Sequence, residues 1–204
     1  VTRINEPLDF ELKELDPAHP YLKSRGLSRR TIDHFGLGFC SRGLLKDRIA
    51  IPLHDSQGRL IGYAGRLVDD SKIRDENAKY KLPSSRERSG VMLEFRKSLF
   101  LYHSQSLKKP LDLIIVVEGF ASVWWLWEHG FPDCMAIMGS SCSQEQTLLL
   151  VQALKPEGQF WIMTDGDEAG ETCAGELLKA LAPHRLVRWI ALPPGTQPTD
   201  LGSI

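Results

Sequence analysis

The sequence predicts an α/β fold: a mostly parallel four-stranded sheet with helices on both faces, preceded by a smaller α+β subdomain. From Leu111 onward, short apolar runs alternate with helical stretches, which is the pattern of β-α-β units. Before that point, two short helical segments and a hairpin pattern indicate a different arrangement. We therefore expect two domains, residues 1–110 and residues 111–204.

The first subdomain begins with two predicted helices. Asp16-Pro17 is typical of a helix start, with an N-cap followed by proline at the first helical position, and Gly26 is typical of the end of that helix. Ser28 then caps a second predicted helix, which ends at Gly36 because glycine readily adopts the left-handed conformation that ends helices.

A hairpin and a long loop are expected next. The apolar segments 48–53 and 60–65 flank Asp55-Ser56-Gln57-Gly58, which is a turn sequence, and together they predict an antiparallel pair. Residues 69–90 are polar and lack periodicity, so we expect a long surface loop there.

The second domain alternates strands and helices. Strands are expected at 112–117, 134–138, 159–164 and 186–191, and helices at 121–129, 143–154 and 169–181. Trp124, Trp125 and Trp127 lie on a helix with few polar positions, which favours a place in the core over base stacking.

Acidic residues follow two of these strands at their carboxyl ends. Glu118-Gly119 follows the first strand, and Asp165-Gly166-Asp167 follows the third. The carboxyl ends of parallel strands form one edge of the sheet, where ligands bind. Carboxylates are hard oxygen ligands for Mg²⁺ or Mn²⁺, which in turn hold phosphate oxygens. This placement predicts phosphoryl-transfer chemistry.

The net charge of −1 conceals an uneven distribution. Residues 1–110 hold 21 Lys and Arg against 14 Asp and Glu, whereas residues 111–204 hold 4 against 12. Basic surface attracts polyanions, and acidic surface needs a divalent cation before phosphate approaches, so the two halves fit a nucleic-acid or nucleotide partner. A solvated, dipolar surface is the alternative, and charge alone does not decide between them.

Other features of the composition exclude several classes of protein. No apolar run approaches the roughly 20 residues that span a bilayer, so we expect no membrane segment and a cytoplasmic location. The four cysteines are scattered, without a C-x-x-C pair or a histidine at ligand spacing. We therefore expect reduced, structural thiols and neither a zinc site nor a disulfide framework.

The acidic motifs together resemble a known family. A strand ending in Glu118-Gly119, the turn Gly139-Ser140-Ser141, and a strand leading into Asp165-Gly166-Asp167-Glu168-Ala169-Gly170 resemble the Toprim domain, over roughly residues 111–202. The resemblance implies that Glu118, Asp165 and Asp167 are catalytic and bind metal. The later acidic motif of the family falls on residues 197–201, where Gln197 replaces its first carboxylate and only Asp200 remains, as a metal ligand or equally as a helix cap.

The first 110 residues resemble the catalytic core of DnaG-type DNA primases. The motifs that carry this likeness are, in order, YLKSRGLS (21–28), FGLGF (35–39), RIAIPL (48–53), GRLIGYAGR (58–66), KY followed by PS (79–84) and LFLY (99–102). The resemblance implies metal-dependent, template-directed synthesis of short RNA primers from ribonucleoside triphosphates on single-stranded DNA. It also implies a replicative helicase as a partner through regions outside this chain. The zinc-binding segment of the family lies outside these residues, so no zinc is expected here.

Several residues are candidates for holding nucleic acid or nucleotide. Cations in or beside the hairpin and the loop are placed to track a template backbone or to neutralise a triphosphate. Each cation taken singly is more readily explained as a solvated surface charge, whereas the cluster is a better candidate than its members. Backbone N–H groups beside the acidic motifs are candidate phosphate contacts. These candidates are Arg48, Arg66, Lys79 and Lys81, with Gly119, Ser140 and Ser141.

Two other hypotheses use the same carboxylates. A Toprim nuclease would hydrolyse a phosphodiester with water as the nucleophile, and a non-catalytic module would bind nucleic acid without turnover. The primase-like motifs of residues 1–110 favour primer synthesis, because a nuclease needs no such hairpin.

Overall fold

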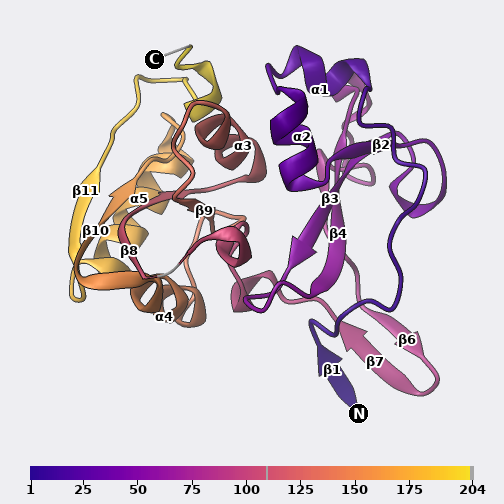
Figure 1. The fold of residues 1–204 in the computed structure, drawn as a ribbon, viewed down its shortest axis with the longest axis horizontal. Helices are drawn as coiled ribbons and strands as arrows, with labels where there is room; N and C mark the ends of the chain where they lie inside the picture. The colour runs from indigo at the N-terminus through magenta and orange to yellow at the C-terminus, as the bar shows by residue number, and fades with distance from the viewer. Residues whose placement is uncertain (109, 203–204) are drawn as a thin grey trace. The chain divides into compact units, whose positions relative to one another are not determined.

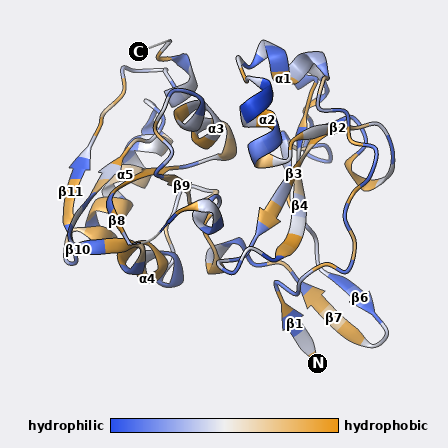
Figure 2. Cartoon of the chain, viewed as in Figure 1, coloured by the Kyte–Doolittle hydropathy of each residue, from blue (hydrophilic) through white to orange (hydrophobic). Residues whose placement is uncertain are grey.

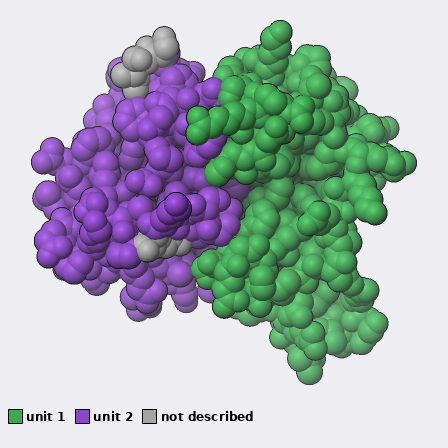
Figure 3. Space-filling view, viewed as in Figure 1, with its two compact units in different colours: residues 1–96 green, residues 97–204 purple. Residues whose placement is uncertain are grey.

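The computed structural model describes residues 1–108 and 110–202, and the chain divides into two compact units, Val1–Arg96 and Lys97–Ile204 (Figures 1 and 3). The division lies before the boundary expected at residue 110. Tyr102 forms a β-bridge with Ala136, and Leu101 belongs to the core of the second unit. The segment that begins at Lys97 therefore packs with the second unit.

The first unit contains two sheets and two short helices. The larger sheet is antiparallel with order β2-β3-β4-β5, formed by β2 (Gly38–Cys40), β3 (Arg48–His54), β4 (Leu60–Leu67) and β5 (Tyr80–Lys81). The smaller sheet has order β1-β7-β6, formed by β1 (Thr2–Ile4), β7 (Val91–Glu94) and β6 (Arg86–Arg88). The helices are α1 (Pro20–Ser24) and α2 (Arg29–Phe35), and the 3₁₀ turns are η1 (Gly43–Leu45) and η2 (Asp70–Lys72).

The predicted second helix and the predicted hairpin are confirmed. Ser28 caps α2 by accepting a hydrogen bond from the Thr31 N–H, and Gly36 ends the helix with a φ of 62°. Strands β3 and β4 pair along their length, with Ala50 opposite Gly65.

Two expectations for the first unit are wrong. Helix α1 starts at Pro20 with His19 as its N-cap, because the Asp16 backbone pairs with Phe39 in a β-bridge. Residues 69–90 are not an unstructured loop, since they contain η2, β5 and β6. Strand β6 turns into β7 through Ser89-Gly90, whose φ values of 52° and 76° are those of a type I′ hairpin turn.

The second unit has the predicted parallel sheet, in the order β11-β10-β8-β9. Its strands are β8 (Leu111–Val117), β9 (Cys134–Ala136), β10 (Leu154–Ile162) and β11 (Leu186–Trp189). Its helices are α3 (Phe120–Glu128), α4 (Gln144–Ala153) and α5 (Glu168–Leu181). Three 3₁₀ turns, η3 (Lys97–Leu99), η4 (Ser104–Ser106) and η5 (Pro198–Asp200), complete the unit.

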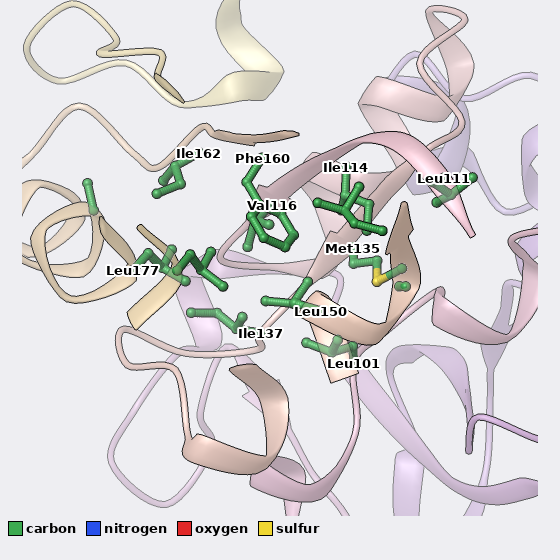
Figure 4. Packing of buried hydrophobic residues seen from close by; sticks show 14 of the residues in the cluster. Leu101, Leu111, Ile114, Val116, Met135, Ile137, Leu150, Phe160, Ile162 and Leu177 are labelled. Carbon is green, nitrogen blue, oxygen red and sulfur yellow. The ribbon is translucent and has the colours of Figure 1, made fainter. Parts of the chain in front are cut away.

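Helices cover both faces of this sheet, as predicted. Ile114 and Phe160 are fully buried on one face, in a cluster with Leu150 of α4 and Leu177 of α5 (Figure 4). The alternate residues of β8 point to the opposite face. There Cys134, which pairs with Ile115, lies against α3 and places its thiol 3.7 Å from the Val123 carbonyl.

The tryptophan-rich helix belongs to the core, as expected. Trp124 and Trp125 are buried, and the Trp124 indole N–H donates to the Tyr102 hydroxyl at 2.9 Å. All four cysteines are free thiols. Across residues 1–108 and 110–202, no helix is both long enough and apolar enough to cross a bilayer.

Candidate functional site

Glu118 directly follows β8, next to the end of β10. The Met163 N–H donates to the Val116 carbonyl at 3.0 Å, which keeps the two strands paired to their carboxyl ends. One step further, the Glu118 Oε1 accepts a hydrogen bond from the Asp165 N–H at 2.9 Å. The two acidic motifs, 47 residues apart in the chain, therefore meet at this edge of the sheet.

The three predicted carboxylates influence one another. Burial raises the pKa of the half-buried Glu118 carboxyl above its usual value, the hydrogen bond from Asp165 lowers it, and the negative charges of Asp165 and Asp167 raise it further. Electrostatic repulsion among carboxylates marks a place where a cation is favoured. The structure thus brings Glu118, Asp165 and Asp167 together, as the sequence predicts.

Asp167 also has a structural role. It is the N-cap of α5, and its Oδ1 accepts a hydrogen bond from the Gly170 N–H at 2.8 Å. This use of the side chain fixes the carboxylate at the helix start, where the helix dipole favours negative charge.

Two glycines let the acidic turn pack closely. A Cβ added at Gly170 would lie 1.9 Å from the Asp165 carbonyl oxygen, and one added at Gly166 would lie 2.2 Å from the Pro193 carbonyl oxygen. The Gly166 N–H donates to the Thr196 carbonyl at 2.8 Å, so the loop after β11 lies against this turn. The positions of these glycines in the motif therefore follow from steric contact.

Among the described residues, no group of three or more His, Cys, Asp or Glu side chains is already arranged to hold a metal ion. The donor set nevertheless fits a hard divalent cation, because its members are carboxylates that repel one another. Mg²⁺ usually keeps several waters and takes one or two carboxylates together with substrate phosphates, so it needs no closed protein cage.

The remaining candidates of the second unit lie in segments that follow its strands along the chain. Gly119 is the N-cap of α3, and Ser140 and Ser141 are exposed in the loop after β9. Asp200 lies in η5, where its Oδ2 accepts a hydrogen bond from the Gln197 N–H at 2.8 Å and closes a capping box. The Asp200 carboxylate thus has a capping role, one of the two alternatives that the sequence left open.

Lys97 is a candidate that the sequence reasoning missed. Its Nζ donates to the Met138 carbonyl at 3.0 Å, at the end of β9, where Met138 has a positive φ of 58°. A Cβ added at the adjacent Gly139 would lie 2.6 Å from the same Nζ, so the ammonium group rests on this loop. Lys97 lies 41 residues from Met138 in the chain, and no local sequence pattern connects the two.

The two arginines predicted to contact a nucleic-acid backbone are buried, each with a relative exposure of 4%. The Arg48 guanidinium donates to the Ala78 carbonyl at 2.8 Å and to Asn77 Oδ1 at 2.6 Å. These contacts hold the segment before β5 against β3, so Arg48 serves the fold.

Arg66 is likewise engaged within the first unit. It pairs with Asp70 at 2.7 Å, and its guanidinium lies 5.5 Å from the ring centroids of Tyr21 and Tyr80. The burial of Arg48 and Arg66 and their contacts within the unit differ from the expectation that both arginines are open to a ligand. Of the other two cations, Lys79 is exposed, and the half-buried Lys81 donates to the Leu44 carbonyl at 3.2 Å.

Comparison with known proteins gives the class of the second unit. Residues 112–191 match the family described as the Toprim domain, and these residues include all three clustered carboxylates. The fold, the sheet order and the acidic motifs agree with that match, so the second unit is a Toprim domain.

About nine-tenths of the chain is similar to bacterial DNA primases. It is 29% identical to the DNA primase of Pseudomonas aeruginosa, over 89% of this chain and 32% of that protein. It matches the Aquifex aeolicus primase structure of zinc-binding and RNA polymerase domains with a TM-score of 0.72 and 26% identity, over 89% of this chain and 51% of that one. It also matches a DnaG primase catalytic domain bound to single-stranded DNA, with a TM-score of 0.70 and 25% identity, over 91% of this chain and 66% of that one. The chain thus spans about a third of the length of the curated relative.

Proposed function

We propose that this chain is the RNA-polymerising core of a DNA primase, which joins ribonucleoside triphosphates into a short RNA primer on a single-stranded DNA template. The observation that carries the proposal is the Glu118 carboxylate accepting the Asp165 N–H, with the Asp167 charge beside it. The relatedness to primase cores over about nine-tenths of the chain supports it. The proposal includes a cytoplasmic location, where template and triphosphates are available.

The three carboxylates would hold Mg²⁺ or Mn²⁺. When bound, such an ion neutralises the triphosphate and stabilises the charge that develops as the α-phosphate is attacked. Glu118 Oε1 is committed to the Asp165 N–H, whereas Oε2 makes no hydrogen bond within the part of the chain that the structure describes. Oε2 is therefore the Glu118 atom that is available to a ligand.

Glu118 is also suited to accept a proton. In the metal-free chain, the pKa of the Glu118 carboxyl lies above that of an ordinary glutamate because of burial and the neighbouring aspartates. We propose that it assists the loss of a proton from the attacking 3′-hydroxyl, while Asp165 and Asp167 would hold the divalent cation that neutralises the triphosphate.

Cations and backbone groups around the acidic edge would hold the phosphates. The Lys97 ammonium donates to the Met138 carbonyl in the loop after β9, and Ser140 and Ser141 are exposed in the same loop, at the carboxyl end of the strand beside β8. Lys79 and Lys81 of the first unit are the remaining candidates for the template backbone. A helicase partner, which the resemblance implies, belongs to regions outside this chain.

The experiment that tests this function is incubation of the chain with single-stranded DNA, labelled ribonucleotides and Mn²⁺. Template-dependent labelled RNA, lost in Glu118→Gln, is the expected product. Shortening of labelled DNA without RNA synthesis would instead show the nuclease, and binding of DNA without either reaction would show a non-catalytic module. A longer relative that contains the same core, assayed in parallel, establishes that the conditions support synthesis.

A further inference from the structure

The first unit contains a cavity of about 870 Å³, and no residue of the acidic motifs lines it. Its walls come from the extended segment 5–13, from η1, from β4, and from strands β6 and β7 of the small sheet. Small-molecule sites have volumes of roughly 300–1,000 Å³ and combine apolar walls with a few polar groups. The cavity has the size of such a site.

The strand register places three arginines on the cavity face of the small sheet. Arg86 of β6 and Arg3 of β1 lie on either side of Leu93, and Arg88 lies opposite Val91. Residues directly opposite one another in a sheet point to the same face. All five residues line the cavity, which agrees with the register.

Of the alternate residues of the small sheet, only Glu94 at the end of β7 also lines the cavity. Glu87, Met92 and Thr2 are paired with one another across the three strands, and none of them lines the cavity. Figure 2 shows the resulting contrast between the hydrophilic β6 and the hydrophobic β7. The guanidinium groups are therefore concentrated on the inner face.

Two of these arginines form exposed ion pairs, and the third, Arg86, acts on Asp9 only through its charge. Arg3 pairs with Glu6 at 3.0 Å, and Arg88 pairs with Asp9 at 3.1 Å, with both side chains of the second pair more than 60% exposed. Exposed pairs of this kind are weak because water screens them, so a more highly charged ligand displaces the carboxylate readily. Arg86 forms no ion pair within residues 1–108 and 110–202.

The part of the lining that comes from segment 5–13, η1 and β4 includes apolar residues and aromatic rings. Leu12, Leu45 and Ile61 are among them, together with Tyr63. The Tyr63 hydroxyl accepts a hydrogen bond from the Leu12 N–H at 3.1 Å, which holds the ring in the cavity lining. A ligand in the cavity therefore meets both cations and an apolar, aromatic surface.

We propose that this cavity binds a mononucleotide, with its phosphates on Arg86 and Arg88 and its base against the Tyr63 wall. A guanidinium group pairs with phosphate through two parallel hydrogen bonds, and the base has an apolar face suited to an aromatic wall. An acidic peptide would supply only carboxylates, which Glu6 and Asp9 already provide. This site is separate from the acidic edge of the Toprim domain and does not depend on its proposed function.

The experiment is calorimetric titration of the full chain with ATP in EDTA, which removes binding that needs a divalent cation. We expect ATP to bind, and Arg86→Gln/Arg88→Gln to weaken the affinity at least tenfold. The matched control is Glu87→Gln, on the same strand and the opposite face, with an affinity within twofold of the wild type. Adenosine and tripolyphosphate should each bind more weakly than ATP.

Several results would overturn the proposal. They are the absence of ATP binding to the wild type, an unchanged affinity in the double variant, or an equal loss in Glu87→Gln. Tripolyphosphate that binds as tightly as ATP would also refute a nucleotide site. Among the described residues, Arg86 is exposed and makes no ion pair, so the single variant Arg86→Gln should keep the wild-type melting temperature. A loss of ATP affinity in this variant therefore reports lost binding and not lost folding.

Discussion

At the scale of single residues, Glu118 combines a hydrogen bond that supports the fold with a charge that opposes it. Its Oε1 accepts the Asp165 N–H, but burial and two neighbouring aspartates raise the pKa of its carboxyl. A raised pKa in the folded state means that the protonated form stabilises the fold below the unfolded pKa of about 4.3. This contribution is lost as the pH rises through the folded pKa.

We therefore expect Glu118→Gln to raise the free energy of unfolding in metal-free solution at pH 7 and to change it less at pH 4. Glutamine keeps the acceptor for Asp165 and removes the charge. Nucleotide incorporation should fall by about 100-fold or more, on the order of 3 kcal/mol in the activation barrier. Urea denaturation at the two pH values and a primer-synthesis assay measure these effects. A gain in stability confined to pH 4 would contradict the electrostatic account.

The basic residues show what the sequence could not predict at this scale. The sequence shows that Arg48 and Arg66 are charged but does not show their burial. Their partners, Asn77 and Asp70, belong to a segment without periodicity, and the contacts form only when that segment folds over the larger sheet. The positions of Glu118, Asp165 and Asp167 at the ends of strands were predictable, because an apolar run that ends in a carboxylate locates the end of a buried strand.

At the scale of elements, the start of α5 depends on two glycines in close contact with neighbouring backbone. An added methyl at Gly166 or Gly170 would overlap a carbonyl oxygen at 2.2 or 1.9 Å. We expect Gly166→Ala and Gly170→Ala each to lower the free energy of unfolding by about 1–3 kcal/mol, the usual cost of overpacking. Thermal or urea denaturation provides the measurement.

Gly175 is the matched control within the same helix. A Cβ added there meets nothing within 4 Å, so Gly175→Ala should instead stabilise the protein by about 0.5–1 kcal/mol through helix propensity. Equal effects at positions 170 and 175 would mean that steric contact does not explain the motif glycines.

Elements with local signals were predictable, and elements defined by distant partners were not. Ser28 and Gly36 delimit α2, and Ser143 begins α4 with a capping box, all within a few residues. Strand β5 has two residues and exists only because it pairs with the edge of β4. The Ser89-Gly90 turn was a local signal for the β6–β7 hairpin. Strand β6 was nevertheless missed, because all three of its residues are charged and show no alternation of apolar and polar positions.

At the scale of the whole molecule, the acidic edge should couple metal binding to stability. A divalent cation that binds only the folded chain stabilises it by mass action, by about 2.7 kcal/mol at a concentration of about 100 times Kd. We expect Mn²⁺ to raise the melting temperature of the wild type but not of Asp165→Asn/Asp167→Asn. Asparagine is as good an N-cap as aspartate, so the variant should keep the start of α5. An equal shift in both proteins would place the metal elsewhere.

The division of the chain at residues 96 and 97 predicts which part of the molecule folds alone. Phe100, Leu101 and Tyr102 are at most 3% exposed. The buried Gln146 amide donates to the Phe100 carbonyl at 3.1 Å, and the Ser143 hydroxyl donates to the Ser98 carbonyl at 2.6 Å. Residues 97–108 therefore supply both apolar area and hydrogen-bond acceptors to the Toprim core.

A polypeptide of residues 97–204 should therefore unfold cooperatively in urea, whereas one of residues 111–204 should lose most of its stability. Fully burying one large apolar side chain contributes about 1.5–3 kcal/mol, and each donor left unsatisfied costs about 1–3 kcal/mol more. The summed loss is comparable to the 5–15 kcal/mol that typically stabilises a domain. Circular dichroism during urea titration of both polypeptides provides the comparison. Equal midpoints would show that the segment from 97 to 110 is a linker, and that the Toprim core is complete from β8 onward.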